Sequence, residues 1–135
     1  LQLADRLKRL LGDSTRFLFV LGRQEEAERD ALEAMQRPDF AIAHCRPVPE
    51  LSAIMLRARL VVANDCGPSH IAQGACVPYV GIFNEPNPEW FWHRPGSAAV
   101  VPRRPGDGID TITPDDVLGA CRTVLEHHAH TAYAG

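Results

Sequence analysis

The sequence predicts an α/β fold, a Rossmann-like doubly wound domain built on a parallel sheet. Three observations predict it. Short apolar runs typical of strands alternate along the chain with amphipathic segments typical of helices. The expected strands are apolar at nearly every position, as strands covered on both faces are. The chain has 135 residues, of which 45% are hydrophobic and 23% charged, so one globular domain with an apolar core is expected.

The amino-terminal half is expected to alternate helices with two strands. In chain order the sequence predicts a helix over 1–11, a strand over 16–21, a helix over 24–37, a strand over 40–44 and a helix over 49–58. The first helix carries Leu3, Leu7 and Leu10 at helical spacing and ends at Gly12. The second consists of strong helix formers with acidic residues in its first turn, and Pro38 ends it.

The carboxy-terminal half is expected to hold three further strands and a long final helix. The strands are predicted over 59–63, 78–83 and 98–102, with a short aromatic helical turn or loop over 86–93. The final helix has the clearest start, because Thr113 can cap it and Pro114 suits its first position. Asp115 and Asp116 then favour the positive end of the helix dipole.

Composition excludes several classes of function. A net charge of −3 and an isoelectric point near 6.1 predict no basic face, so a nucleic acid is not an expected partner. No apolar run approaches the roughly 20 residues of a membrane-spanning helix. The four cysteines lack the CxxC spacing of metal and redox motifs, so we expect free thiols in a reducing cytoplasm and no designed metal site. Neighbouring histidines at 127, 128 and 130 are expected to bind metal only adventitiously.

The stretch "RLVVANDCGPSHIAQG" over 59–74 turns abruptly from apolar to polar. Ligands of parallel sheets bind beyond the carboxyl ends of strands, so the turn from Asn64 to His70 is where a site is expected. Gly67 obstructs nothing, Pro68 suits a first helical position, and the amides of Ser69 and His70 are expected to be unpaired donors. Such donors suit phosphate, to which His70 could add a hydrogen bond or a positive charge. An ordinary connection with an Asn or Asp cap has the same spacing, so spacing alone leaves both interpretations open.

The order of residues in and after this stretch favours the functional interpretation. "NDCGPSHIAQGACVPYVGIFNEPNP" resembles the signature of glycosyltransferase family 9, the heptosyltransferases of lipopolysaccharide assembly, in which a strand ends in an Asp-x-Gly-x-x-His turn. Asp65, Gly67 and His70 match that turn. Asn84 and Glu85 depart from the Gly-Pro usual in the last loop, whose Pro86 and Pro88 otherwise match a "GPTDP"-like pattern. Further upstream, "FLFVLGRQEE" is similar to a second pattern of this family, a strand followed by Gly and then by the acidic start of a helix. The resemblance covers residues 16 to about 102.

The resemblance implies that the chain is the donor half of a GT-B type enzyme, in which two Rossmann-like domains face each other across a cleft. Residues 1–126 would form the sugar-nucleotide-binding domain, without the acceptor domain and without the donor domain's own first strand. We expect a frayed His-rich tail over 127–135. The implied reaction is inverting transfer of heptose from ADP-heptose to a lipid-linked lipopolysaccharide-core acceptor, at the cytoplasmic face of a bacterial inner membrane. The chain alone is expected to be inactive.

The resemblance also assigns roles to residues. The donor diphosphate would be held by the turn, through Cys66, Gly67, Pro68, Ser69 and His70. Asp65 would bind a sugar hydroxyl or order the turn, as an N-cap or Asx-turn residue does. Glu26 would bind the nucleotide ribose, with Glu25 a near alternative. No catalytic residue is expected in this chain, because the general base lies on the missing half, and no metal or cofactor is expected.

Two further questions stay open at this point. The aromatic segment from Trp90 to His93 could stack on a base or sugar, or could serve core packing or an interdomain contact. The chain could also be a non-catalytic nucleotide-binding or interaction module, or part of another two-domain sugar-nucleotide enzyme, such as a hexose epimerase or a transferase fused to helical repeats.

Overall fold

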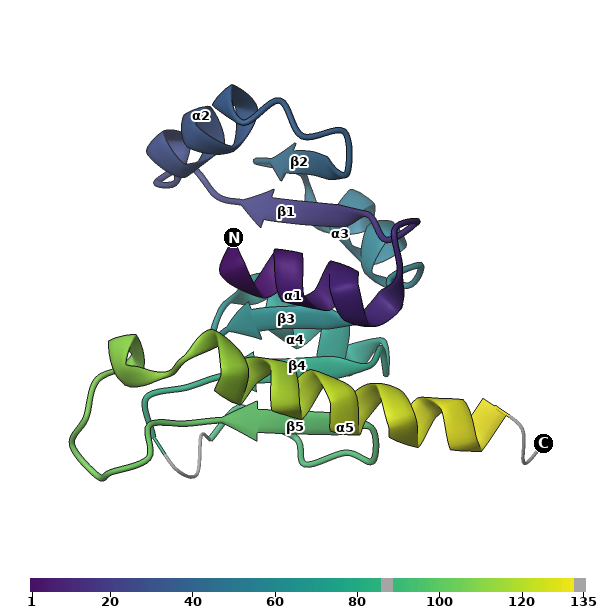
Figure 1. The fold of residues 1–135 in the computed structure, drawn as a ribbon, viewed down its shortest axis with the longest axis vertical. Coiled ribbons are helices and arrows are strands. Elements are labelled where there is room, and N and C mark those ends of the chain that lie inside the picture. Colours follow the sequence, from purple (N-terminus) through teal and green to yellow (C-terminus); the bar gives the residue numbers. More distant parts are fainter. Residues whose placement is uncertain (86–88, 133–135) are drawn as a thin grey trace. The chain divides into compact units, whose positions relative to one another are not determined.

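The computed structural model describes residues 1–85 and 89–132, and Pro86, Pro88 and residues 133–135 of the expected tail lie outside them. The chain divides into two compact units, Leu1–Glu50 and Leu51–Gly135, and each contains its own parallel sheet (Figure 1). Helices alternate with strands as predicted, and the predicted α/β class with parallel sheets is confirmed. The domain boundaries at 1–126 and 127–135 remain predictions.

The first unit contains a two-stranded sheet. Its elements are α1 (Gln2–Leu11), β1 (Phe17–Leu21), α2 (Glu26–Ala34) and β2 (Phe40–His44), followed by the start of α3 (Val48–Met55), which runs into the second unit. β1 and β2 are parallel, with Leu21 paired to His44 at their carboxyl ends. α2 is shorter than predicted because Gln36 adopts a left-handed backbone (φ 49°) before Pro38 is reached. Leu18 is 42% exposed, so β1 is less completely covered than its apolar pattern predicts.

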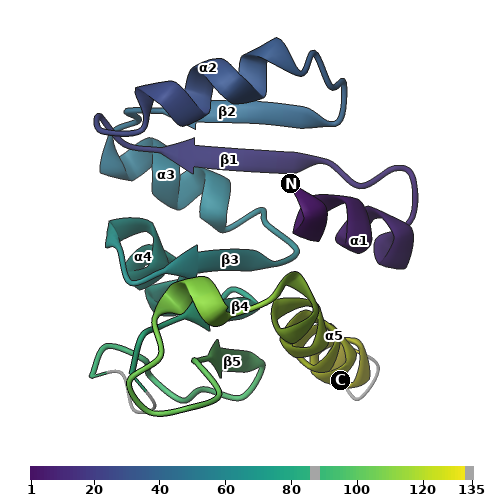
Figure 2. The same ribbon diagram turned by 60° about the vertical axis from the view of Figure 1, so that its left-hand side comes forward.

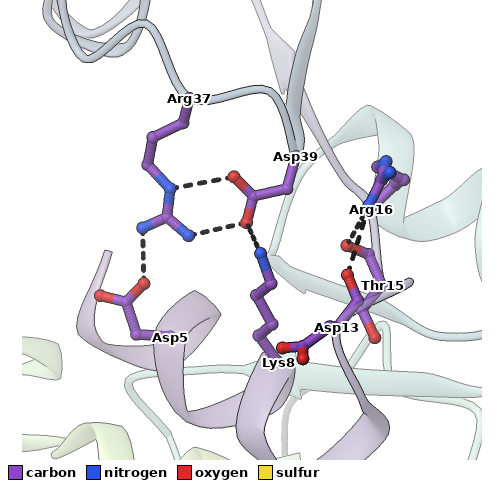
Figure 3. Close-up of polar contacts among 7 residues, drawn as sticks. All are labelled: Asp5, Lys8, Asp13, Thr15, Arg16, Arg37 and Asp39. Carbon is purple, nitrogen blue, oxygen red and sulfur yellow. Dashed lines mark hydrogen bonds and ion pairs between the residues drawn. The ribbon is translucent and has the colours of Figure 1, made fainter.

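A charged network joins α1 to the turn that precedes β2 (Figure 3). The Asp39 side chain is only 4% exposed, and it accepts hydrogen bonds from Lys8 Nζ (2.9 Å) and from Arg37 Nε and Nη2 (3.1 and 2.7 Å). Arg37 also pairs with Asp5 and lies over the Phe40 ring, 4.0 Å from its centroid. A buried carboxylate is tolerated only when it is paired and hydrogen-bonded, and this network meets that requirement.

The network predicts that the first unit is sensitive to acid. Arg37 and then Lys8 hold the pKa of Asp39 well below its usual value. A carboxyl group with a lowered pKa stabilises the fold above its unfolded pKa of about 4, and this contribution is lost as the pH falls below that value. Asp39→Asn should therefore lower the melting temperature at pH 7, and the difference from wild type should shrink by pH 3. Circular dichroism melts at both pH values measure this.

Asp13→Asn is the matched control for that experiment, because the Asp13 side chain is exposed and lies outside the network. We expect this control to melt like the wild type at both pH values. An Asp39→Asn difference that stayed constant from pH 7 to pH 3 would show that the ionised carboxylate is not the source of the stabilisation.

The second unit is a three-stranded parallel sheet with a helix on each face. Its elements are β3 (Val61–Asn64), α4 (Gly67–Gly74), β4 (Tyr79–Ile82), β5 (Ser97–Val100), the short 3-10 helix η1 (Ile109–Thr111) and α5 (Pro114–Ala132). The strand order is β3-β4-β5, and α4 and α5 cover opposite faces of the sheet (Figures 1 and 2). This arrangement is the doubly covered parallel sheet that the apolar strands predict.

The core of this unit is centred on β4. Tyr79 and Val80 are 1% and 0% exposed, and burial raises the pKa of Tyr79 to about 12. Gly81, the next residue, is paired with Ala63 on β3 and Ala99 on β5, so small residues meet across all three strands. An added Cβ at Gly81 would lie 2.2 Å from the ring of Phe83. The glycine therefore makes room for an aromatic ring to fold over the sheet.

The final helix begins as predicted and continues further. The Thr113 hydroxyl accepts a hydrogen bond from the Asp116 amide (3.2 Å), and the Asp116 carboxylate accepts one from the Thr113 amide (2.9 Å). The structure continues α5 to Ala132, through the first part of the tail that we expected to fray. Contacts of its histidines explain part of this, because His128 Nε2 lies 3.3 Å from the carbonyl oxygen of Gly96.

Within the two described ranges, no helix combines the length and the apolar character needed to cross a bilayer.

Candidate functional site

The candidate site is the turn that links β3 to α4. β3 ends at Asn64, and Cys66 takes the N-cap position with an extended backbone (φ −159°, ψ 168°). α4 begins at Gly67, so Pro68 is its second residue, one position later than the sequence predicts. Since Cys66 is the cap, Asp65 does not cap the helix. The predicted position of the turn, at the carboxyl end of a parallel strand and the start of a helix, is confirmed.

The turn is closed by hydrogen bonds of its own. The Ser69 hydroxyl donates to the carbonyl oxygen of Cys66 (2.7 Å) and accepts from the Cys66 amide (3.3 Å). The amides of Ser69 and His70 also donate to the Cys66 carbonyl oxygen, at 3.0 and 3.4 Å. The expectation that these two amides are unpaired is therefore wrong. The extended backbone of Cys66 places its carbonyl oxygen over the first turn, where both amides reach it.

Gly67 remains the open point of the turn. It is exposed, and a Cβ added to it would meet no atom within 4 Å. Its amide donates no hydrogen bond to the protein within residues 1–85 and 89–132. One free amide thus lies at the positive end of the α4 dipole, on an exposed residue. A glycine here keeps that space clear and is not required by packing.

Three partly exposed side chains with different chemistry meet beside the turn. His70 Nε2 lies 3.6 Å from Asp65 Oδ1, with the two side chains 41% and 51% exposed. The His70 ring also contacts the Trp90 ring, with centroids 5.9 Å apart and planes nearly perpendicular (89°). A carboxylate, an imidazole and an indole are therefore available to one ligand at this edge of the sheet.

Gln73, which the sequence analysis did not single out, ties the aromatic segment to α4. Its side chain is 4% exposed, donates from Nε2 to the Trp90 carbonyl oxygen (3.1 Å) and accepts at Oε1 from the Trp92 amide (3.0 Å). The signal in the sequence is a polar residue inside the apolar stretch that follows the turn, which predicts a buried side chain with specific partners.

The aromatic residues of this segment serve different purposes. Phe91 is 7% exposed and packs between the rings of Phe83 and His93, with centroids 5.9 and 4.7 Å away. Trp90 and Trp92 are 53% and 47% exposed. Core packing therefore accounts for Phe91 alone, and the two indoles remain accessible.

Glu26 lies in the first unit, where it is the exposed first residue of α2. The preceding Glu25 uses its carboxylate to accept a hydrogen bond from the Gly22 amide, which closes the turn after β1. Glu25 is thus committed to local structure. Of the two candidates for binding the ribose, Glu26 is the one that begins α2, and its side chain is exposed to solvent.

The four cysteines are free thiols. Cys121 is fully buried, and this burial raises the pKa of its thiol to about 11. Cys66 is part of the turn and partly exposed. Within the part of the chain that the structure describes, no three His, Cys, Asp or Glu side chains are grouped so as to hold a metal ion.

Comparison with known proteins matches this sequence to a family. The family model for glycosyltransferase family 9 (heptosyltransferase) matches residues 8–100, which is more than half of the chain. The chain belongs to glycosyltransferase family 9. The matched range includes both the turn at Asp65 to His70 and Glu26.

Two solved structures resemble the fold of this family 9 chain. A family 9 glycosyl transferase from Veillonella parvula has 21% identity and a TM-score of 0.73 over 93% of this chain and 40% of its own. The E. coli heptosyltransferase WaaC, solved with ADP, has 17% identity and a TM-score of 0.71 over 95% of this chain and 39% of its own. The chain thus spans about two fifths of each. A search of curated proteins finds no match to the sequence.

Proposed function

We propose that this chain is the donor-binding part of an inverting glycosyltransferase that transfers heptose from ADP-heptose to a lipopolysaccharide-core acceptor. The observation that carries the proposal is the open turn at Gly67, at the carboxyl end of β3 and inside the range that the family model matches. Ligands of open parallel sheets bind at this edge. A structurally similar heptosyltransferase was solved with ADP, and this supports a nucleoside diphosphate as the ligand.

The proposed chemistry is stabilisation of the departing diphosphate. Negative charge grows on the diphosphate as the bond to the sugar breaks, and a fixed amide with a helix dipole stabilises such charge. The Gly67 amide and the start of α4 supply these groups, and His70 adds an imidazole. Cys66, Pro68 and Ser69 shape the turn, with Ser69 acting through its hydrogen bonds to Cys66. Asp65 binds a sugar hydroxyl and Glu26 the ribose.

The remaining parts of the reaction are assigned outside this chain. The general base and the site for a lipid-linked saccharide acceptor belong to a second domain, and the enzyme works at the cytoplasmic face of the inner membrane. The chain by itself, with residues 1–126 as its donor domain, binds nucleotide but transfers no sugar.

Calorimetric titration with ADP, GDP and UDP tests the proposal. We expect ADP to bind the wild-type chain, and Gly67→Val to weaken that binding at least about ten-fold, because the added side chain occupies the open space beside the Gly67 backbone. Gly74→Val is the matched control, since it alters the other end of α4 at an exposed glycine whose added Cβ also meets no atom within 4 Å.

Each result of the titration leads to a different conclusion about the site. Binding of ADP that both variants retain would place the nucleotide away from the turn. Binding that both variants lose equally would indicate damage to α4 instead of a blocked site. No binding of any of the three nucleotides by the wild-type chain would contradict a donor site formed by this chain and would favour an interaction module.

A further inference from the structure

Trp90 has features that core packing does not explain. Its side chain is 53% exposed although it contacts the ring of His70, a residue of the candidate site. The contact is perpendicular, so it covers at most one face of the indole. A large aromatic surface therefore stays in solvent directly beside the turn.

The position of Trp90 is set by α4. Gln73 lies three residues after His70, about one helical turn further along the same helix. Its buried amide group holds the backbone on both sides of Phe91, through the Trp90 carbonyl oxygen and the Trp92 amide. Because a buried amide group is costly to leave unpaired, this pair of hydrogen bonds keeps the indole beside His70.

The chemistry of the cluster matches a sugar ring. Hydroxyl groups of a sugar form hydrogen bonds with a carboxylate, here that of Asp65, which lies next to the His70 ring that Trp90 contacts. The C–H groups of the same ring are weakly positive, and they pack against the negative face of an indole. A diphosphate, which needs amides and positive charge, gains nothing from that face.

We propose that the indole of Trp90, whose backbone is hydrogen-bonded to Gln73, contacts the sugar of the nucleotide-sugar donor. The inference rests on the proposed function and adds a residue that selects the intact donor over the free nucleotide. Trp92 serves as the comparison within the same segment. It is 47% exposed, but the guanidinium carbon of Arg94 lies 4.8 Å from the centroid of its ring.

Affinities for ADP-heptose and for ADP, measured by calorimetry, test the proposal. Trp90→Ala should weaken ADP-heptose binding by about five-fold, the size expected of one aromatic contact, while ADP binding stays unchanged. Trp90→Phe should restore most of the loss because it keeps an aromatic face. Trp92→Ala should change neither affinity, and circular dichroism establishes that each variant is folded.

Fluorescence supplies a direct readout, because the chain contains only two tryptophans. Trp92→Phe leaves Trp90 as the only indole, and its emission should change more with ADP-heptose than with ADP. Trp90→Phe leaves Trp92, whose emission should respond equally to both ligands. Failure of the wild type to bind ADP would overturn the proposed function. If the wild type binds ADP, two results for Trp90→Ala would overturn the role of Trp90 and leave the proposed function intact. One is an unchanged affinity for ADP-heptose, and the other is an equal loss of affinity for ADP-heptose and for ADP.

Discussion

Replacing Phe91 by alanine is expected to lower the free energy of unfolding of the second unit by about 3 to 4 kcal/mol. Phe91 is 7% exposed and lies among the rings of Tyr79, Phe83 and His93. Truncation removes a large apolar surface and leaves a cavity beside β4, which neighbouring rings fill only in part. The segment after β4 would lose its attachment to the core.

Urea unfolding followed by circular dichroism measures this loss. Trp92→Ala is the matched control, because it removes an even larger side chain one residue away that is 47% exposed. We expect that control to cost less than about 1 kcal/mol, the worth of an exposed contact between Arg94 and an indole. Equal losses in the two variants would show that Phe91 is not part of the core.

Gly81→Val is expected to destabilise the second unit by about 3 kcal/mol. The new Cβ would lie 2.2 Å from the Phe83 ring and 2.7 Å from the Tyr79 hydroxyl. Both side chains are almost fully buried, at 4% and 1% exposure, so neither ring can move into solvent without losing its own packing. Urea unfolding monitored by tryptophan emission measures the effect, since both tryptophans lie in this unit.

A double-mutant cycle identifies the clash behind this prediction. Phe83→Leu shortens the ring that an added Cβ would meet, so Gly81→Ala should cost less in the Phe83→Leu background than in the wild type. Equal costs in the two backgrounds would mean that Phe83 does not set the requirement for glycine, and that backbone conformation or another neighbour does.

The strands were predictable because apolar runs leave few alternatives. All five predicted strands are present, and none of their boundaries moves by more than two residues. The start of α5 was equally clear, since Thr113, Pro114 and Asp116 each favour a helix start and the structure uses them in that way. Helix ends were less predictable. α2 ends early at the left-handed Gln36, and α5 continues past the expected end of the domain.

The candidate site was predictable in position and less so in detail. Polar residues after the apolar stretch at β3 located the turn, because ligands approach parallel sheets at the carboxyl ends of their strands. The wrong expectation concerned the amides of Ser69 and His70. Sequence shows that first-turn amides need acceptors, but only the backbone angles at Cys66 decide that its carbonyl oxygen accepts from both.

The α/β class, the place of the turn and the family were all predictable from the sequence, because they follow from local patterns of apolar residues and from a short motif. Tertiary structure alone decided which aromatic side chain is buried and which is free. Trp90, Phe91 and Trp92 are adjacent and similar in chemistry, yet only Phe91 packs into the core. That outcome depends on Gln73, which bonds backbone atoms 17 and 19 residues further along the chain, and on Phe83, whose ring packs against Phe91. No local pattern specifies such contacts.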